Sequence, residues 1–228
     1  MSSISKPQFD FYTQNRSKLI DQYLNDFPLR IDPDAVRDLF MPIGYNRSNV
    51  KAYDEICKVL TEDIFFEALN RNLIVRKIIF ASGLPGSGKS THLTKMTKDE
   101  LVYDVTINDD EKFVRYINRA LMMGYKVQVF IYSVQPEIAF QRNLNRGDEL
   151  GRYVPIDHYE KVADSLNRRE SLLIHNFQKR VKLFNFEHTR FEGKLNKFSN
   201  IKIDRDGLET IARNHRFSDS EILHSVIE

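Results

Sequence analysis

The sequence predicts an α/β fold of three layers, in which a mostly parallel central sheet is flanked by helices. Three observations support this class. Short apolar segments alternate along the chain with longer segments of helical periodicity. A glycine-rich turn follows one of the apolar segments. The chain has 228 residues, of which 41% are apolar, and this is enough for one domain with a sizeable core.

The first third of the chain is expected to be mainly helical. In order, we expect a helix at residues 8–26, an extended piece at 28–32, a short segment at 34–40 and a helix at 48–69. The last of these is recognised by Tyr53, Ile56 and Leu60, whose spacing places them on one face of a helix. This part therefore supplies at least two amphipathic helices.

Strands and helices alternate in the rest of the chain. Strands are expected at residues 74–80, 101–106, 126–133, 181–186 and 199–204. Helices are expected at residues 89–97, 110–123, 136–146, 156–180 and 206–226. Gly124 is placed to end the second of these helices. The alternation is typical of βα units with parallel strands.

Composition narrows the partners and the compartment. The formal net charge is only +2, which argues against a nucleic acid as partner. Cys57 is the only cysteine, so no internal disulfide forms. The N-terminal sequence lacks the apolar core of a signal peptide, and no run is long enough to span a bilayer. We therefore expect a cytoplasmic protein without a membrane partner.

The glycine-rich turn is a phosphate-binding motif. The pattern G-x-x-x-x-G-K-[ST] is matched at each fixed position by Gly83-Leu84-Pro85-Gly86-Ser87-Gly88-Lys89-Ser90. The glycines let backbone N–H groups approach phosphate oxygens, and the following helix directs the positive end of its dipole at them. Lys89 is expected to bridge the β- and γ-phosphates of ATP, Ser90 to ligate Mg²⁺, and Thr91 to contact the nucleotide. With an apolar strand before the motif and a helix after it, a chance glycine turn is a poor explanation.

The motif predicts a P-loop NTPase fold, but the kind of enzyme depends on other features. A guanine-specific N-K-x-D motif is absent, because Asn196-Lys197 is followed by Phe198-Ser199. Motor and AAA-type ATPases are usually larger than this chain. A short chain with an arginine-bearing helical segment late in its sequence suggests a small-molecule kinase, by analogy at the level of the fold.

Later segments carry a set of recognisable motifs. These are an acidic-x-Thr strand end at residues 101–106, a G-Y-x-V turn and strand at 124–130, two segments with spaced arginines at 136–146 and 151–155, and a late strand segment at 181–192. Together they resemble the zeta-toxin family of bacterial P-loop kinases, in which the arginine segments form a lid. The resemblance covers about residues 75–195 and implies a kinase that uses ATP and Mg²⁺.

One motif of that family is out of place in this chain. The family normally has a strand ending I-D-x-D, then a long helix, between the phosphate loop and the acidic-x-Thr strand. Only residues 91–100 lie there, whereas Ile31-Asp32-Pro33-Asp34 and the helix at 48–69 lie upstream. We interpret residues 1–228 as one domain in permuted order, such as a circularly permuted member of the family. The alternative is that residues 1–72 are a helical appendage that covers the nucleotide site, as in fused antitoxin arrangements.

The resemblance assigns candidate roles on the acceptor side. A kinase must orient or deprotonate a substrate hydroxyl. Asp34 matches the second acid of I-D-x-D and is the candidate base, with Asp32 and Arg37 as candidate substrate contacts. Asp104 ends an apolar strand, where P-loop enzymes often have an acid near the metal, so it is a candidate ligand of Mg²⁺ and, with Thr106, a candidate substrate contact. The competing interpretation is that Asp32 and Asp34 cap a helix, and that Asp104 and Thr106 are an ordinary strand end.

Three arginines are candidates for phosphate binding. The guanidinium group suits phosphate because it stays charged and can donate two parallel hydrogen bonds. Arg146 and Arg152 are expected to act in catalysis, and Arg142 to contact the nucleotide. Arg142 and Arg146 are four residues apart and share one face of a helix. The competing interpretation is a solvated basic helix whose arginines pair with Glu137, Asp148 and Glu149.

The expected function is transfer of the ATP γ-phosphate to a hydroxyl of a small nucleotide-type acceptor. The resemblance implies an acceptor such as UDP-N-acetylglucosamine and toxicity that an antitoxin protein restrains. A nucleotide, NAD or polynucleotide kinase is the alternative enzyme. A binding switch that holds ATP without transferring phosphate is the alternative of another class.

Overall fold

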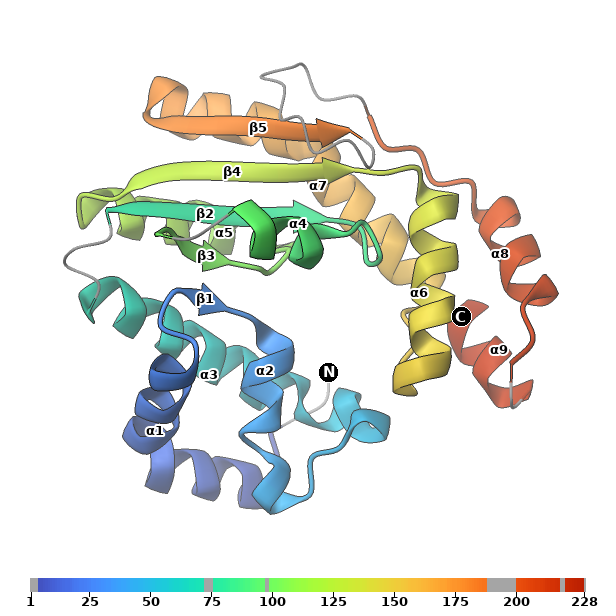
Figure 1. Cartoon of the computed structure of the whole chain (residues 1–228), viewed down its shortest axis with the longest axis horizontal. Coiled ribbons are helices and arrows are strands. Elements are labelled where there is room, and N and C mark those ends of the chain that lie inside the picture. Colours follow the sequence, from blue (N-terminus) through green and yellow to red (C-terminus); the bar gives the residue numbers. More distant parts are fainter. Residues whose placement is uncertain (1–3, 72–75, 97–98, 188–199, 218–219, 228) are drawn as a thin grey trace.

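The computed structural model describes residues 4–71, 76–96, 99–187, 200–217 and 220–227. Within these residues the strands form a five-stranded sheet in the order β1-β3-β2-β4-β5, and each neighbouring pair is parallel (Figure 1). The expected α/β fold with a parallel sheet is confirmed. The strands are β1 (Arg30–Ile31), β2 (Lys77–Gly83), β3 (Leu101–Tyr103), β4 (Lys126–Ser133) and β5 (Val181–Glu187).

The helices form layers on the two faces of the sheet. In order, they are α1 (Lys6–Asp26), α2 (Pro33–Asp38), α3 (Val50–Arg71), α4 (Lys89–Met96), α5 (Asp110–Met122), α6 (Pro136–Leu150), α7 (Ile156–Phe177), α8 (Arg205–Asn214) and α9 (Ser220–Ile227). Figure 1 shows α4 on one face of the sheet and α5 and α7 on the other, with α6, α8 and α9 beyond the carboxyl ends of the strands. No helix in the described part of the chain is long and apolar enough to span a bilayer.

Two apolar clusters hold the layers together, because successive strand residues point to opposite faces. On the face of α4, a small cluster joins Ile79 of β2 and Leu93 of α4. On the other face lies the main core, to which β2 contributes Ile78 and Phe80. Strands that are buried on both faces read as continuous apolar runs, and this explains why their positions could be predicted from the sequence.

The N-terminal segment is part of this sheet. β1 pairs with β3 at its edge, with Ile31 opposite Tyr103. α3 packs on the same face as α5, where Phe65 stacks on Tyr116 at 4.5 Å between ring centroids. Phe65 also contacts Tyr103 of β3 edge-on. The segment therefore shares its apolar core with the later βα units.

Two predicted elements near the C-terminus are corrected. Residues 200–204 form no strand, although 199–204 was predicted as one, and residue 199 lies outside the described residues. The side chain of Asn167 in α7 donates to the carbonyl of Ile201 and accepts from its N–H, so this segment is paired with a side chain instead of a strand. The helix predicted at 206–226 is two helices, because His215 has extended backbone angles at the end of α8.

Other predicted elements differ only at their ends. The strand predicted at 101–106 ends at Tyr103, and the helix predicted at 136–146 continues to Leu150, where Gly151 caps it in the left-handed conformation. The helix predicted at 156–180 ends at Phe177. Residues 74 and 75 of the strand predicted at 74–80, and residues 188–192 of the late strand segment, lie outside the described residues.

Candidate functional site

The phosphate loop connects the carboxyl end of β2 to the start of α4, the edge of a parallel sheet where ligands usually bind. Gly86 and Gly88 have φ values of +79° and +83°, which other residues rarely adopt. A Cβ atom at Gly86 would lie 2.1 Å from the carbonyl oxygen of Ala139, so only glycine lets the loop pack against α6. Space is open beside Gly88, where a Cβ atom would meet nothing within 4 Å. The loop therefore has a glycine-dependent backbone next to open space.

Contacts from outside the motif hold the loop in place. The hydroxyl of Thr106 accepts from the N–H of Gly83 at 3.1 Å and donates to its carbonyl at 3.0 Å. The hydroxyl of Tyr159 in α7 donates to the carbonyl of Pro85 at 2.9 Å. Leu84 is fully buried in the main core. The loop is thus tied to the segment after β3 and to α7.

The ammonium group of Lys89 folds back toward the phosphate loop. It lies 3.4 Å from the carbonyl oxygen of Gly83. Burial lowers the pKa of Lys89, and the charges of Asp104, Asp32 and, more weakly, Asp34 act in the opposite direction. These carboxylates therefore lie close enough to influence the Lys89 ammonium group, although Asp32 and Asp34 are far from it in sequence.

Ser90 and Asp104 meet at the position expected for Mg²⁺. The Ser90 hydroxyl donates to Oδ2 of Asp104 at 2.8 Å, and Arg30 of β1 donates to the same oxygen at 2.6 Å. One hydroxyl and one carboxylate beside a phosphate loop fit Mg²⁺, which usually takes only one or two protein ligands and completes its shell with phosphate oxygens and water. Among the described residues there is no group of three or more acidic, His or Cys side chains that could hold a metal alone. Thr91 is exposed on α4 next to this pair.

Asp34 lies at the centre of a cluster of arginines. Its Oδ1 accepts from Arg37 at 2.5 Å and from Arg152 at 2.6 Å. Arg146 lies 3.7 Å from its Oδ2. Burial raises the pKa of Asp34, but Arg152 and Arg37 outweigh this effect and hold its pKa below the usual range. Asp34 is therefore ionised at neutral pH, and two residues from the predicted lid contact it.

Asp32 shows the capping contact that we considered as its competing interpretation. Its carboxylate accepts from the backbone N–H of Asp34 at 2.9 Å and caps α2. Burial, and then the charge of Asp104, raise the pKa of Asp32. Arg37 reaches from α2 to both Asp34 and Asp54 of α3. Arg142 lies on the exposed surface of α6, one helical turn before Arg146.

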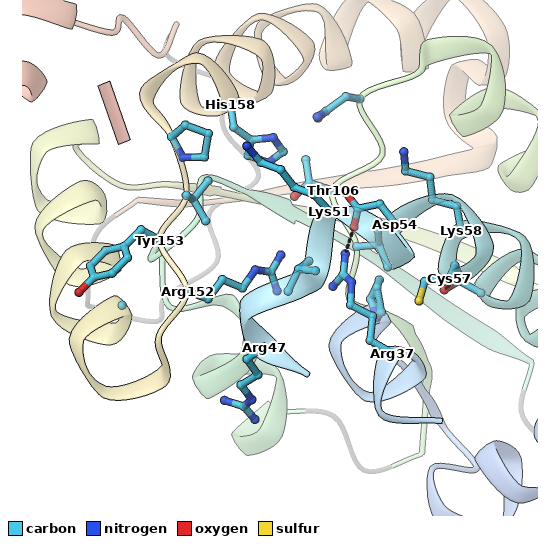
Figure 2. Close-up of a pocket in the computed structure, with 18 of the residues that line it drawn as sticks. Arg37, Arg47, Lys51, Asp54, Cys57, Lys58, Thr106, Arg152, Tyr153 and His158 are labelled. Carbon is cyan, nitrogen blue, oxygen red and sulfur yellow. Dashed lines mark hydrogen bonds and ion pairs between the residues drawn. The ribbon is translucent and has the colours of Figure 1, made fainter. Parts of the chain in front are cut away.

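A cavity of about 1130 Å³ adjoins this cluster. Figure 2 shows Arg152 reaching toward it from the predicted lid, and Arg37 and Lys51 from the N-terminal elements. Tyr153 points the other way, and its hydroxyl donates to Asp148 at 2.7 Å. The cations in the cavity wall outnumber the carboxylates; they are Arg37, Arg47, Lys51, Lys58, Lys112 and Arg152, against Asp54, Asp109 and Asp148.

Sequence reasoning missed several residues of this region. Arg30 contacts Asp104 only because β1 lies beside β3, and nothing in the local sequence indicates that pairing. His158 lines the cavity, and burial, then Arg152, lower its pKa, which favours the neutral imidazole. Ile222 and Ser225 of α9 line the same cavity, from the region that we predicted only as a final helix.

Comparison with known proteins supports the family resemblance. Residues 96–191 match the family model described as Zeta toxin. No curated protein matches the chain. The matched segment begins after the phosphate loop and ends before α8, so neither the loop nor residues 31–37 contribute to it. The match is consistent with a member of the zeta-toxin family, and the resemblance seen in the later motifs is confirmed.

Proposed function

Because residues 96–191 match the zeta-toxin family and residues 83–90 form a phosphate loop in the same sheet, we propose that the protein is an ATP-dependent kinase. It transfers the γ-phosphate to a hydroxyl of a small, nucleotide-type acceptor. The bond between the γ-phosphorus and the β–γ bridging oxygen breaks, and a bond from the acceptor oxygen to phosphorus forms. ADP leaves, and the hydroxyl proton passes to a carboxylate.

One observation carries this proposal: Asp34 accepts hydrogen bonds from two arginines that line the cavity, and its charge also acts on Lys89 of the phosphate loop. Arg37 and Arg152 both line the cavity and both donate to the Asp34 carboxylate. The charge of Asp34 also acts on the pKa of Lys89 in the phosphate loop. A carboxylate between a nucleotide site and an acceptor cavity is where a group that accepts the hydroxyl proton is needed.

Each residue then has a role in transfer. The backbone of the loop and Lys89 hold the phosphates. Ser90 and Asp104 would hold Mg²⁺, which would supply positive charge beside the phosphates. Asp34 orients and deprotonates the acceptor hydroxyl, and Asp32 caps the N-terminus of α2, which carries Asp34. Arg146 and Arg152 stabilise the charge on the transferring group, and Arg142 contacts the nucleotide. Thr106 and Arg37 position the loop and the acceptor.

The cavity favours an anionic acceptor. Six cations line it against three carboxylates. Four of the six also pair with carboxylates: Arg37 with Asp34 and Asp54, Arg152 with Asp34, Lys58 with Glu55 and Lys112 with Glu62. A diphosphate linked to a sugar, such as UDP-N-acetylglucosamine, has negative charge that suits this basic wall and a free hydroxyl that can accept the γ-phosphate. An antitoxin protein as partner is also part of the proposal, because the match to the Zeta toxin family implies one.

A product assay tests the proposal. The purified protein is incubated with labelled ATP, Mg²⁺ and, separately, nucleotide sugars, NAD or oligonucleotides, and the products are identified by mass spectrometry. We expect label on a nucleotide sugar, and none with Lys89→Ala as matched control. Label on NAD or an oligonucleotide instead supports the alternative kinase class. ATP binding without any labelled product supports a nucleotide-dependent switch and overturns the kinase proposal.

We also propose that the chain is a single domain with its βα units in altered order. The sheet places β1 next to β3, and Asp32 and Asp34 directly follow β1. Relative to the order that the family resemblance implies, the unit β1–α3 precedes the unit β2–α4 instead of following it. This is an exchange of two adjacent units, and a circular permutation would instead place the phosphate loop near the C-terminus.

A further inference from the structure

A fully buried arginine lies outside the site described above. Arg169 belongs to α7 and has no exposed surface. Its guanidinium carbon lies 3.7 Å from the centre of the Phe113 ring of α5. Two of its nitrogens, Nε and Nη1, are buried without a hydrogen-bond partner among the described residues. Burial lowers the pKa of Arg169 to about 10, so it remains charged at neutral pH.

The remaining nitrogen of Arg169 binds one specific point of the backbone. Its Nη2 donates to the carbonyl of Ile107. The same nitrogen donates at 2.6 Å to the hydroxyl of Ser165, which lies one turn earlier in α7. The Ser165 hydroxyl lies 3.4 Å from the same carbonyl. Helix α7 therefore places a buried cation and a buried hydroxyl on the carbonyl of Ile107.

Ile107 lies in the segment that joins the two halves of the proposed site. Residues 104–109 connect β3 to α5. The carboxylate of Asp104 accepts a hydrogen bond from Ser90, and the hydroxyl of Thr106 bonds to both the N–H and the carbonyl of Gly83. Asn108 and Asp109 line the acceptor cavity. A shift of the Ile107 carbonyl would therefore move the metal ligand, the contact to the phosphate loop and the cavity wall together.

A buried arginine stabilises a core less than an apolar side chain of similar size does. Removing a guanidinium group from water carries a large penalty, and apolar replacements of buried charges are often neutral or stabilising. Two nitrogens without a hydrogen-bond partner among the described residues, Nε and Nη1, add to this penalty. We propose that Arg169 is a positioning residue that fixes segment 104–109, and through it the geometry between the phosphate loop and the acceptor cavity. The catalytic consequence rests on the proposed kinase function.

The test compares Arg169→Met with Arg168→Met. Arg168 is adjacent in α7 and is half exposed, and its Nε pairs with Asp110 at 3.0 Å. Its substitution therefore removes a cation and leaves the hydrogen bond to the Ile107 carbonyl in place. Three quantities are measured: the thermal unfolding midpoint, deuterium exchange of the peptide that contains residues 104–109, and kcat with KM for ATP and for the acceptor. Exchange needs no turnover, so it tests the positioning role even if the kinase proposal fails.

For Arg169→Met we expect faster deuterium exchange in residues 104–109 and a thermal unfolding midpoint that is unchanged or higher. We expect kcat to fall by about tenfold or more, because small misplacements of reacting groups slow transfer strongly. KM for ATP should change less than KM for the acceptor. Arg168→Met should resemble the wild type in each quantity. Unchanged exchange and kcat in Arg169→Met, or a lower midpoint with normal kcat, overturn the positioning role.

If Arg169→Met does not fold, Ser165→Ala gives the same test more mildly. It removes the hydroxyl that Arg169 and the Ile107 carbonyl share, and it leaves the arginine in place. Faster exchange in residues 104–109 with a smaller loss of kcat supports the role. Exchange equal to that of the wild type contradicts it.

Discussion

The nucleotide side and the acceptor side of this protein are built in different ways. The phosphate loop is one continuous segment, residues 83–90, whose glycines, lysine and serine are close in sequence and in space. The acceptor cavity is lined by residues between 33 and 61, 103 and 112, 147 and 158, and 222 and 225. A local site can be recognised from a motif, whereas the cavity exists only once the sheet has brought distant segments together.

Deleting residues 1–72 tests whether the distant segments are structural. The deletion removes β1 and α3 and exposes the ring cluster around Tyr103 and Tyr116, which Phe65 covers. We expect loss of cooperative thermal unfolding, since burial of such aromatic side chains contributes several kcal/mol, of the order of the whole stability of a domain. A truncated protein that unfolds cooperatively and transfers phosphate faster would instead show that residues 1–72 are an inhibitory appendage.

Lys89→Ala tests the local side alone. The substitution removes a partly buried cation whose ammonium group lies 3.4 Å from the carbonyl oxygen of Gly83 in its own loop, so stability should change little. We expect kcat to fall by about 10³-fold, because a charge aimed at the transferring group is lost. Lys95→Ala, at an exposed position later in α4, serves as control. Normal turnover by folded Lys89→Ala protein would remove the kinase proposal.

Arginine substitutions test the link between the two sides. Arg152 donates to Asp34 at 2.6 Å with its side chain 35% exposed, whereas Arg146 lies at 3.7 Å and is 62% exposed. We expect Arg152→Ala to lower kcat by about 10²-fold with a smaller change in ATP Kd, and Arg146→Ala to have a weaker effect. Arg152→Lys should rescue only partly, because it loses the planar donor pair. Near-normal kcat in both alanine variants would reassign this segment as a solvated surface.

The smallest effect on activity is expected for substitutions in α9, which forms part of the cavity wall. Ser225 lines the cavity, whereas the adjacent exposed residue His224 does not. Ser225→Trp should raise the acceptor KM by about tenfold and leave the ATP Kd unchanged, because it fills acceptor space only. His224→Trp should leave both quantities unchanged. Equal effects of the two variants would show that α9 does not contact the acceptor.

The sequence predicted most of the fold because its signals are local. Strands buried on both faces appear as apolar runs, and helices show their periodicity, so β2, β4 and α5 were placed within a few residues. The strand predicted at 199–204 was wrong for the described residues 200–204, because the backbone of Ile201 bonds to the side chain of Asn167 and not to a neighbouring strand. The break between α8 and α9 has no proline or glycine to mark it.

The site was only partly predictable for the same reason. The phosphate loop follows from eight consecutive residues, and the family resemblance suggested Asp34, Asp104 and Arg152. Contacts such as Arg30 with Asp104, or Arg169 with Ile107, depend on the pairing of β1 with β3 and the packing of α7. No spacing in the sequence indicates them.

Asp34→Asn gives the most direct measurement, since Asp34 connects the two sides. The carboxylate is half exposed, so its ion pairs contribute little to stability and the variant should fold. ATP Kd should stay within about threefold of the wild-type value, because the phosphate loop is unchanged. Transfer to the acceptor should fall by about 10³-fold, because the group that takes the hydroxyl proton is lost. Wild-type transfer by folded Asp34→Asn protein would contradict the claim that the N-terminal segment supplies the catalytic base of a P-loop kinase.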